Sequence, residues 1–293
     1  MEKFTLCIND TTCIKCGKCV KVCPAHLFVF EPDISNEKGR VIISNINDCI
    51  KCGHCAAVCP TGAVEHSYFP AAKVHKIDYT QYPKPNQIEL ICKSRRSNRA
   101  FNGKPVPQEF LNRILEASHR APTASNLQQV EFTLISNPQV LHQISEYTLN
   151  VFSKIEKKLM NPILKPILKL AIPQAYKYVP KFKIMRKEFA KGNDLILRGA
   201  TAVIFIHTPK ENRFGDADSN LAYQNGSLMA ESLGVSQFYT GFVCTAIKQD
   251  KEDKLSTMLG ISGTIHAGMA LGMTDFKYPN YIDKEELKVK MIL

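Results

Sequence analysis

The stretch CIKCGKCVKVCP at residues 13–24 returns, almost unchanged, as CIKCGHCAAVCP at residues 49–60. Only three of the twelve positions differ when Cys13 is aligned with Cys49. Each copy has the spacing C-x2-C-x2-C-x3-C-P. An internal repeat has to be explained before other features, because it limits the folds that the surrounding chain can adopt. The repeat therefore decides how the first part of this chain folds.

The cysteine spacing favours iron–sulfur clusters over zinc. Paired C-x2-C elements bind structural zinc in four-cysteine sites, so zinc is the first alternative. Three cysteines at intervals of three residues instead wrap around one cubane, and a fourth that precedes proline ligates a second cluster. Zinc modules rarely carry four cysteines in one short run, and here the run occurs twice. The sequence predicts two [4Fe-4S] clusters.

The repeat resembles the two-cluster ferredoxins of bacteria over residues 5–66. The resemblance implies crossed ligation, in which the last cysteine of each copy binds the cluster of the other copy. Glycines 17 and 53 let the backbone bend close to the sulfurs. Neither copy completes a cluster alone, which explains why the motif is doubled. The implied ligand sets are Cys13, Cys16, Cys19 and Cys59 for one cluster, and Cys49, Cys52, Cys55 and Cys23 for the other.

Composition indicates a globular protein of two domains. The chain has 293 residues, of which 44% are hydrophobic and 22% are charged. No apolar run is long enough to cross a bilayer, and the first ten residues do not read as a signal peptide. We therefore expect a cytoplasmic protein without a transmembrane segment. Three of the eleven cysteines lie outside the repeat and are predicted to be small buried residues: Cys7, Cys92 and Cys244.

The rest of the chain alternates helical and strand patterns irregularly, which predicts an α+β sandwich. Residues 107–120 have a helical apolar face, and residues 217–234 have a helical face of small residues suited to close packing. No G-x-G-x-x-G motif follows a strand, so a Rossmann domain is not indicated. The predicted strands are residues 130–136, 201–208, 236–243 and 265–273.

Two polar segments are candidates for ligand binding. The first, SRRSNRAF, holds Arg95, Arg96, Ser97 and Arg99, whose guanidinium groups suit phosphate oxygens. A solvated basic turn, or a nucleic-acid contact, is an alternative for this segment taken alone. The second, APTASNLQ, can lie against a planar ring and bond its polar edge, or can be an ordinary connection. Its candidate residues are Pro122, Thr123, Ala124, Ser125, Asn126 and Gln128.

Together these segments resemble the FMN-dependent nitroreductase family over residues 87–290, and the motifs occur in the family's order. The resemblance implies that the arginine segment holds the FMN phosphate and ribityl chain. The polar loop would contact the isoalloxazine, and Thr240 and Gly241 would lie near its reactive edge. Lys284 is the nearest match to a basic phosphate ligand of the family, which is usually Arg. The family also implies an α+β sandwich and a homodimer with FMN at the subunit interface.

The combined order resembles ferredoxin-fused nitroreductases. We expect a ferredoxin-like domain at residues 1–66, a linker at 67–86 and a nitroreductase-like domain at 87–293. The expected activity is reduction of a nitroaromatic, a quinone or an activated alkene. Electrons would come from reduced ferredoxin or a similar carrier, with no nucleic acid as partner. Alternatives are an electron-transfer module for a protein acceptor and a dehalogenase-like member of the same fold. No catalytic residue is assigned.

Residues 150–198 form a basic stretch, with about 12 Lys and Arg against about 3 acids. The net charge of the chain is +11, so this stretch carries most of the excess. Its four prolines exclude one long regular helix. The stretch is either a solvated helical excursion on one face of the core or a lid over the flavin pocket.

Overall fold

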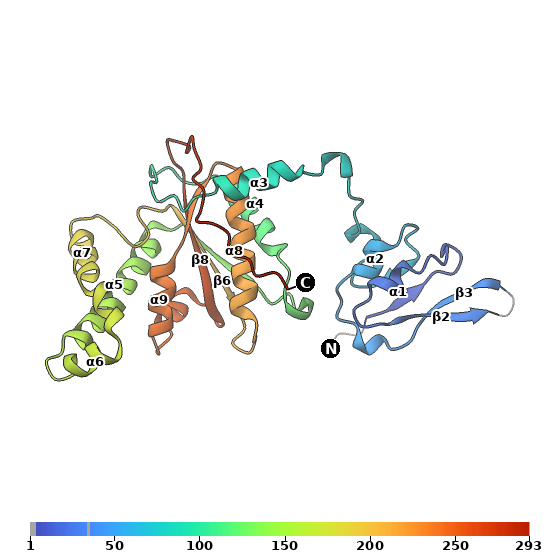
Figure 1. Cartoon of the computed structure of the whole chain (residues 1–293), viewed down its shortest axis with the longest axis horizontal. Coiled ribbons are helices and arrows are strands. Elements are labelled where there is room, and N and C mark those ends of the chain that lie inside the picture. Colours follow the sequence, from blue (N-terminus) through green and yellow to red (C-terminus); the bar gives the residue numbers. More distant parts are fainter. Residues whose placement is uncertain (1–3, 34–35, 293) are drawn as a thin grey trace. The chain divides into compact units, whose positions relative to one another are not determined.

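The computed structural model describes residues 4–33 and 36–292 (Figure 1). These residues form two compact units, one built mainly from residues up to Tyr82 and the other mainly from Pro83 onward. The division falls within the segment expected to link the domains, where two short 3-10 turns, Ala71–Lys73 and Tyr79–Gln81, precede the next helix. Among the described residues no helix is long and apolar enough to span a membrane.

The first unit contains two antiparallel ribbons and two short helices. Strand β1 (Leu6–Ile8) pairs with β4 (Val64–His66), and β2 (Phe28–Asp33) pairs with β3 (Asn36–Ile43). The helices are α1 (Lys18–Val22) and α2 (His54–Val58), which pack together, and a 3-10 turn spans Ile46–Asp48.

The repeat produces the same local structure twice. Each helix follows a glycine in the left-handed region, Gly17 with φ of 68° and Gly53 with φ of 75°. A Cβ atom on Gly17 would lie 2.8 Å from the Phe30 ring, closer than side chains approach one another. Glycine is therefore required at this turn for backbone conformation and for space. Buried Cys23 and Cys55 join the small core around Leu27, Phe28 and Val41.

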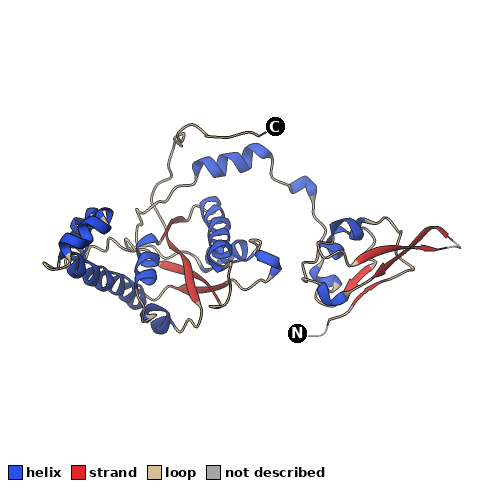
Figure 2. Ribbon diagram, turned by 60° about the horizontal axis from the view of Figure 1, so that its bottom comes forward, coloured by secondary structure: helices blue, strands red, loops and turns tan. Residues whose placement is uncertain are grey.

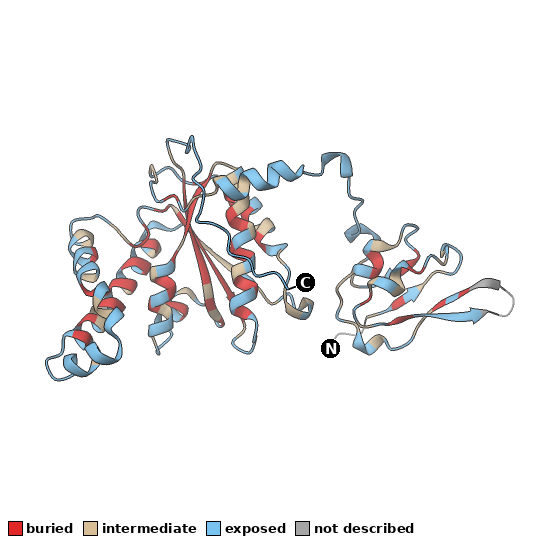
Figure 3. Ribbon diagram, viewed as in Figure 1, coloured by how far each residue is buried: buried red, intermediate tan, exposed pale blue. Residues whose placement is uncertain are grey.

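The second unit contains an antiparallel sheet, drawn in red in Figure 2. It has four strands in the order β5-β6-β8-β7. Its strands are β5 (Glu131–Ile135), β6 (Ala202–Thr208), β8 (Thr264–Gly272) and β7 (Ser236–Tyr239). Every residue of the central strand β6 is buried (Figure 3), as expected for a strand whose first five residues, 202–206, are all apolar.

Helices cover both faces of this sheet (Figure 1), which confirms the predicted α+β sandwich. One face, which includes Ile204 and Met269, packs against α4 (Gln108–His119) and α8 (Gly215–Ser232). A Cβ atom on Gly226 would collide with the Ser118 hydroxyl, so the small-residue face of α8 does permit close packing with α4. The other face, which includes Val203 and Phe205, packs against α5 (Pro138–Met160) and α9 (Gly241–Gln249).

Three sequence predictions about the core need correction. The strand predicted over residues 236–243 ends at Tyr239, because pairing with β8 stops there and α9 begins at Gly241. In α9 the buried residues include Val243 and Ala246, which have helical spacing. Cys7 and Cys92 are exposed, and only Cys244 is buried among the three cysteines outside the repeat. Cys92 lies on α3 (Pro85–Ser94), a helix with no buried residue. The apolar pattern of the sequence does not reveal that this helix is exposed.

The basic stretch is a broken helical excursion. After α5 ends at Met160, the chain forms α6 (Lys165–Ala171), a 3-10 helix (Pro173–Tyr178) and α7 (Val179–Phe189). Each of these last three begins with a proline in its first turn, where the missing N–H has no helical partner to lose. The prediction that prolines interrupt this stretch is confirmed. Helix α10 (Lys254–Leu259) precedes β8.

Candidate functional site

The first candidate site brings cysteines of both repeat copies together. Cys59, from the second copy, lines the same pocket as Cys13, Cys16 and Cys19 from the first. Burial opposes ionisation of Cys59, but hydrogen bonds from the Val64 backbone and from Thr61 outweigh it and lower the pKa of the thiol. A lowered pKa favours the thiolate, which is the form that binds iron.

The second candidate site has the complementary composition. Burial raises the pKa of Cys55 to about 11, and the nearby thiols of Cys49, Cys52 and Cys23 contribute to the rise. The pKa of Cys49 is also raised, mainly by burial. The nearby thiols of Cys52 and Cys23 raise it further. A coordinated thiol is deprotonated outright, so a bound cluster would remove this cost of crowding four thiols together. The residues present therefore fit a cluster.

The described thiols are not gathered around the position of a single metal ion. Within residues 4–33 and 36–292, no group of three or more His, Cys, Asp and Glu side chains is arranged to hold one metal ion. A four-iron cluster is larger than one ion, so its thiolate ligands lie further apart. The two observations are compatible.

The sequence leaves two interpretations for His54 and His66, which flank the cysteine motifs: residues that tune the clusters, or surface residues. For His66 the surface interpretation is wrong. His66 is 3% exposed, and its ring stacks on Phe4 with centroids 4.9 Å apart. Its Nδ1 accepts a bond from the Tyr68 N–H at 3.2 Å, so the proton of the neutral ring lies on Nε2. Nε2 lies 3.7 Å from Sγ of Cys49, which makes it a donor to a predicted cluster ligand. Burial lowers the pKa of His66.

The third candidate site is a cavity of about 750 Å³ in the second unit. The start of α9 and the end of β7 form one side of it, through Gly241 and Tyr239, and Arg99 also lines it. The excursion supplies most of the remaining wall. Of the residues predicted to bind flavin, the cavity therefore brings together Arg99 and Gly241. Thr240, between Tyr239 and Gly241, is itself buried.

Aromatic side chains form a continuous wall in this cavity. Phe152 stacks on Phe182 with ring centroids 4.6 Å apart, and Phe182 continues to Tyr178 at 6.5 Å. On its other side Phe152 meets the edge of Phe242 at 5.9 Å. The guanidinium of Arg99 lies 5.2 Å from the centroid of Phe238. Such a wall suits a flat aromatic molecule.

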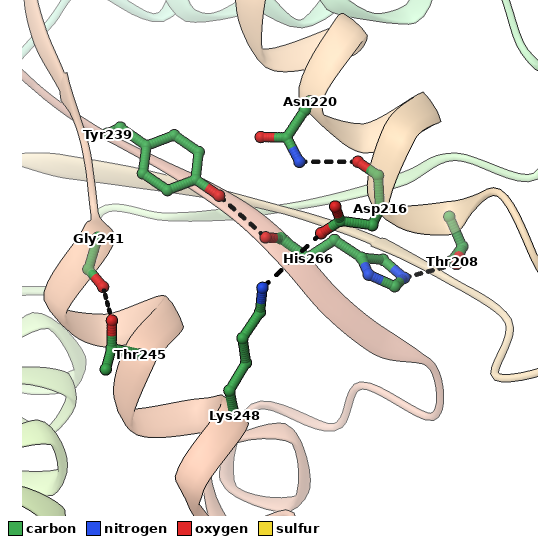
Figure 4. Close-up of polar contacts among 8 residues, drawn as sticks. All are labelled: Thr208, Asp216, Asn220, Tyr239, Gly241, Thr245, Lys248 and His266. Carbon is green, nitrogen blue, oxygen red and sulfur yellow. Dashed lines mark hydrogen bonds and ion pairs between the residues drawn. The ribbon is translucent and has the colours of Figure 1, made fainter. Parts of the chain in front are cut away.

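Polar contacts fix the strand end beside this cavity (Figure 4). The Tyr239 hydroxyl donates to the His266 carbonyl at 3.0 Å, and Nε2 of His266 is 3.0 Å from the Thr208 hydroxyl. On α9 the Thr245 hydroxyl donates to the Gly241 carbonyl at 2.7 Å. Burial raises the pKa of Tyr239, so its hydroxyl keeps its proton at neutral pH. The backbone at Thr240 and Gly241 is therefore held in one position.

The three arginines do not converge on one cavity. Arg96 lines a separate cavity of about 180 Å³ together with Glu231 and Lys277. Its Nη2 atom is buried and has no hydrogen-bond partner among the described residues. An unpaired buried guanidinium nitrogen suits an anionic ligand. Arg95 lies near Tyr223. Burial raises the pKa of Tyr223 to about 12, although the positive charges of Arg95 and Arg99 lower it.

The predicted polar loop lies outside the large cavity and has a strained backbone. Ser125 and Gln128 have φ of 51° and 52°, in the left-handed region that most side chains disfavour, and Asn126, with φ of 53°, is of a residue type that tolerates it. Asp218 on α8 supports the loop, because its Oδ1 accepts the Ala124 N–H at 3.1 Å. Asp218 is 2% exposed, and sequence reasoning missed it because the two segments are remote in the chain.

The remaining predicted residues occupy exposed positions. Ser97 is exposed, and its carbonyl accepts a bond from Nη1 of Arg99 at 3.1 Å. Lys284 is exposed in the C-terminal segment and forms no ion pair with any described residue. The structure of one chain therefore does not assemble all predicted flavin residues in one place.

The fold and its sites define a redox protein in which a cysteine-rich electron-transfer unit precedes an α+β unit with a large aromatic cavity. Residues 92–273 match the model of the nitroreductase family, and residues 12–63 match the model of a 4Fe-4S dicluster domain. Because the first match covers more than half of the chain, the chain belongs to the nitroreductase family.

Solved nitroreductases have the same fold. A nitroreductase with bound FMN from Desulfitobacterium hafniense is 18% identical, with a TM-score of 0.53, over 71% of this chain and 100% of that one. One from Bacteroides fragilis, also with bound FMN, is 21% identical with a TM-score of 0.51, over 71% of this chain and 98% of that one. Among curated proteins, iodotyrosine deiodinase 1 from Rattus norvegicus is 29% identical over 91 residues, which is 29% of this chain and 29% of that protein.

These matches confirm the predicted domain order, a dicluster domain followed by a nitroreductase domain. They also confirm, at the level of the two families, a flavin-dependent oxidoreductase with FMN and two [4Fe-4S] clusters.

Proposed function

We propose that this enzyme passes single electrons through two [4Fe-4S] clusters to FMN and reduces an electron-poor organic acceptor. The observation that carries the proposal is the presence, in one chain, of a dicluster domain and a nitroreductase domain. When bound, FMN exchanges single electrons with clusters and electron pairs or hydrides with organic molecules. Nitroaromatics, quinones and activated alkenes are acceptors that take up electron pairs and protons.

In this proposal the side chains of the protein bind the clusters and the flavin and orient the acceptor. Cys13, Cys16, Cys19 and Cys59 hold one cluster, and the complementary four thiols hold the other; their shared pocket and mutual proximity support this assignment. Arg99 and Gly241 contact the flavin from one side of the large cavity. The aromatic wall from Phe242 to Tyr178 excludes water and leaves room for a flat acceptor.

We also propose that two copies of this chain form a homodimer with a shared flavin site. Among the described residues, the lining of the large cavity includes none from the polar loop, as expected if two chains each contribute part of the site. Several apolar side chains of α3 and the C-terminal segment are exposed, including Leu90 at 57% and Leu287 at 88%. A second copy of this chain would bury them. The thiol-rich clusters favour a reducing compartment such as the cytoplasm.

Replacement of Arg96 or Arg99 by Ala should weaken FMN binding. A charge-assisted bond to phosphate contributes about 1.5–3 kcal/mol, so the dissociation constant should rise roughly tenfold to a hundredfold. Riboflavin lacks the phosphate and should bind almost unchanged. Fluorescence titration of the apoprotein with both flavins measures the difference.

The two arginines can be judged separately, because they line different cavities. An arginine whose loss weakens FMN and riboflavin equally does not hold the phosphate. Light scattering during the same titration reports the assembly state. A monomer that binds FMN with full affinity would contradict a shared site.

Shortening the excursion should broaden the range of acceptors. A variant in which a short Gly-Ser linker replaces α6 and the following 3-10 helix removes Leu168, Ile172 and Tyr178 from the cavity wall. Bulky quinones should then show lower KM values, while FMN content stays at the level of the unmodified protein. If steady-state kinetics for small and bulky acceptors do not change, the excursion is scaffold and not a lid.

One observation favours a second candidate reaction. The chain matches a deiodinase over under a third of either protein. This match suggests a second reaction, the reductive removal of halide from an aromatic ring. Replacing carbon-bound halogen by hydrogen consumes two electrons and one proton and releases halide. Ion chromatography of reactions with halogenated and nitro-substituted rings distinguishes the two reactions. An electron-transfer module for a protein acceptor would reduce neither.

A further inference from the structure

The large cavity has a one-sided charge. Among the residues that the structure describes, its lining includes three cations, Arg99, Lys158 and Arg198, and no Asp or Glu. None of these three cations forms an ion pair with a described residue. Positive charge without a partner around an apolar pocket raises the local concentration of anions.

The acids of the excursion do not compensate this charge. Glu156 is buried and pairs with Arg186 at 3.0 Å, away from the cavity lining. Glu188 pairs with Lys191 at 2.8 Å. Asp194 accepts the Ser145 hydroxyl at 2.7 Å and the Ile196 N–H at 2.7 Å. Each of the excursion's acids therefore already has a partner, whereas Lys158 and Arg198 line the cavity and form no ion pair with any residue that the structure describes.

The shape of the wall restricts the ligand further. The rings of Phe242, Phe182 and Tyr178 line the cavity. Phe152, which is 2% exposed, packs behind them and supports Phe182 and Phe242. Tyr178 is 50% exposed, so this end of the wall reaches solvent. Flat rings bind by stacking on such a wall, while a charged group attached to the ring can remain near the exposed cations.

We propose that the cavity selects flat aromatic acceptors that carry a negative charge, such as a ring carboxylate or sulfonate. This inference rests on the proposed function, because it names the acceptor class of that same cavity. Arg99 is assigned to the flavin, so Lys158 and Arg198 are the residues that determine specificity for the anion. The aromatic body of the acceptor stacks on the wall, and the anionic group lies toward these two cations.

The test compares binding of 4-nitrobenzoate with binding of nitrobenzene, which have the same ring and nitro group but differ in charge. Equilibrium titration of the oxidised, FMN-loaded protein, followed by flavin absorbance, measures both without turnover. Lys158→Glu should raise the dissociation constant of 4-nitrobenzoate about three- to tenfold, as expected for reversing one exposed charge. The dissociation constant of nitrobenzene should stay within about twofold of its value for the unmodified protein. Arg198→Asn removes a second charge at a residue with φ of 56°, a conformation that Asn tolerates. This change should raise the dissociation constant of 4-nitrobenzoate about two- to fivefold.

Lys157→Glu is the matched control. Lys157 is the exposed neighbour of Lys158 on the same helix, and it does not line the cavity. The Lys157→Glu substitution makes the same change in net charge and should leave the preference for 4-nitrobenzoate over nitrobenzene intact. Equal binding of both ligands by the unmodified protein, or equal loss from Lys157→Glu and Lys158→Glu, overturns the inference.

Turnover separates this inference from the proposed function. If both ligands are reduced but bind without charge preference, the inference fails and the proposed function stands. If 4-nitrobenzoate binds preferentially and neither ligand is reduced under any donor, the proposed function fails, while the cavity's preference for aromatic anions holds.

Discussion

Cys59→Ser should destroy the cluster whose other ligands lie in the first copy of the repeat. Cys59 lines the same pocket as Cys13, Cys16 and Cys19, so its loss leaves that cluster with three thiolates. Cys23→Ser should damage the other cluster, because Cys23 lies near Cys49, Cys52 and Cys55. Each variant should fall from about eight irons per chain to about four. Iron and acid-labile sulfide assays on anaerobically purified protein measure this loss.

The chain offers a matched control for the cluster variants. Cys92 is an exposed cysteine outside the repeat, and Cys92→Ser should retain the full iron content. Electron paramagnetic resonance of the reduced protein then shows which cluster each variant keeps. An unmodified protein with about four irons, or with tetrahedral zinc, would rule out two crossed clusters.

Reduced ferredoxin should support acceptor reduction much faster than NADH or NADPH. Clusters carry single electrons, so a dicluster domain is useful when the donor cannot deliver hydride. An acidic carrier would be attracted by the net charge of +11. The rate should fall as salt rises, since exposed charges are screened within about 10 Å at 0.1 M ionic strength. Stopped-flow reduction with each donor over a range of salt concentrations measures both effects.

Removing the clusters should abolish only the ferredoxin route. A variant with Cys23 and Cys59 both replaced by Ser should lose ferredoxin-dependent turnover, while dithionite still reduces bound FMN directly. This comparison separates a broken electron path from a misfolded flavin domain. Full turnover with NADPH in that variant, together with none from ferredoxin in the intact protein, would show that the proposed order of electron transfer is wrong.

Local patterns predicted most of the architecture. The doubled cysteine motif predicts that the backbone bends at Gly17 and Gly53, and both glycines lie in the left-handed region. The unbroken apolar run at β6 predicts a strand buried on both faces, and both faces are covered by helices. The small-residue face of α8 predicts close helix packing, which Gly226 permits. These features follow from side-chain type and period, which can be read along the chain.

Burial of individual polar residues required the tertiary structure. His66 reads as a surface residue, yet it stacks on Phe4 and approaches Cys49, because β4 returns beside β1. Cys92 reads as a core residue, yet its helix has no buried side chain. Exposure depends on which distant segments pack nearby, and no local pattern reports that.

The sequence by itself determined the ligand types, their spacing and the order of the two domains, because these depend on neighbouring residues. Only the tertiary structure decided which charges meet. It separates Arg96 from Arg99 into different cavities and pairs Glu156 with Arg186 outside the large one. Within the described part of the chain it also leaves Lys158 and Arg198 without an ion-pair partner beside the aromatic wall. Electrostatic environment depends on distances between residues remote in the chain, and folding sets those distances.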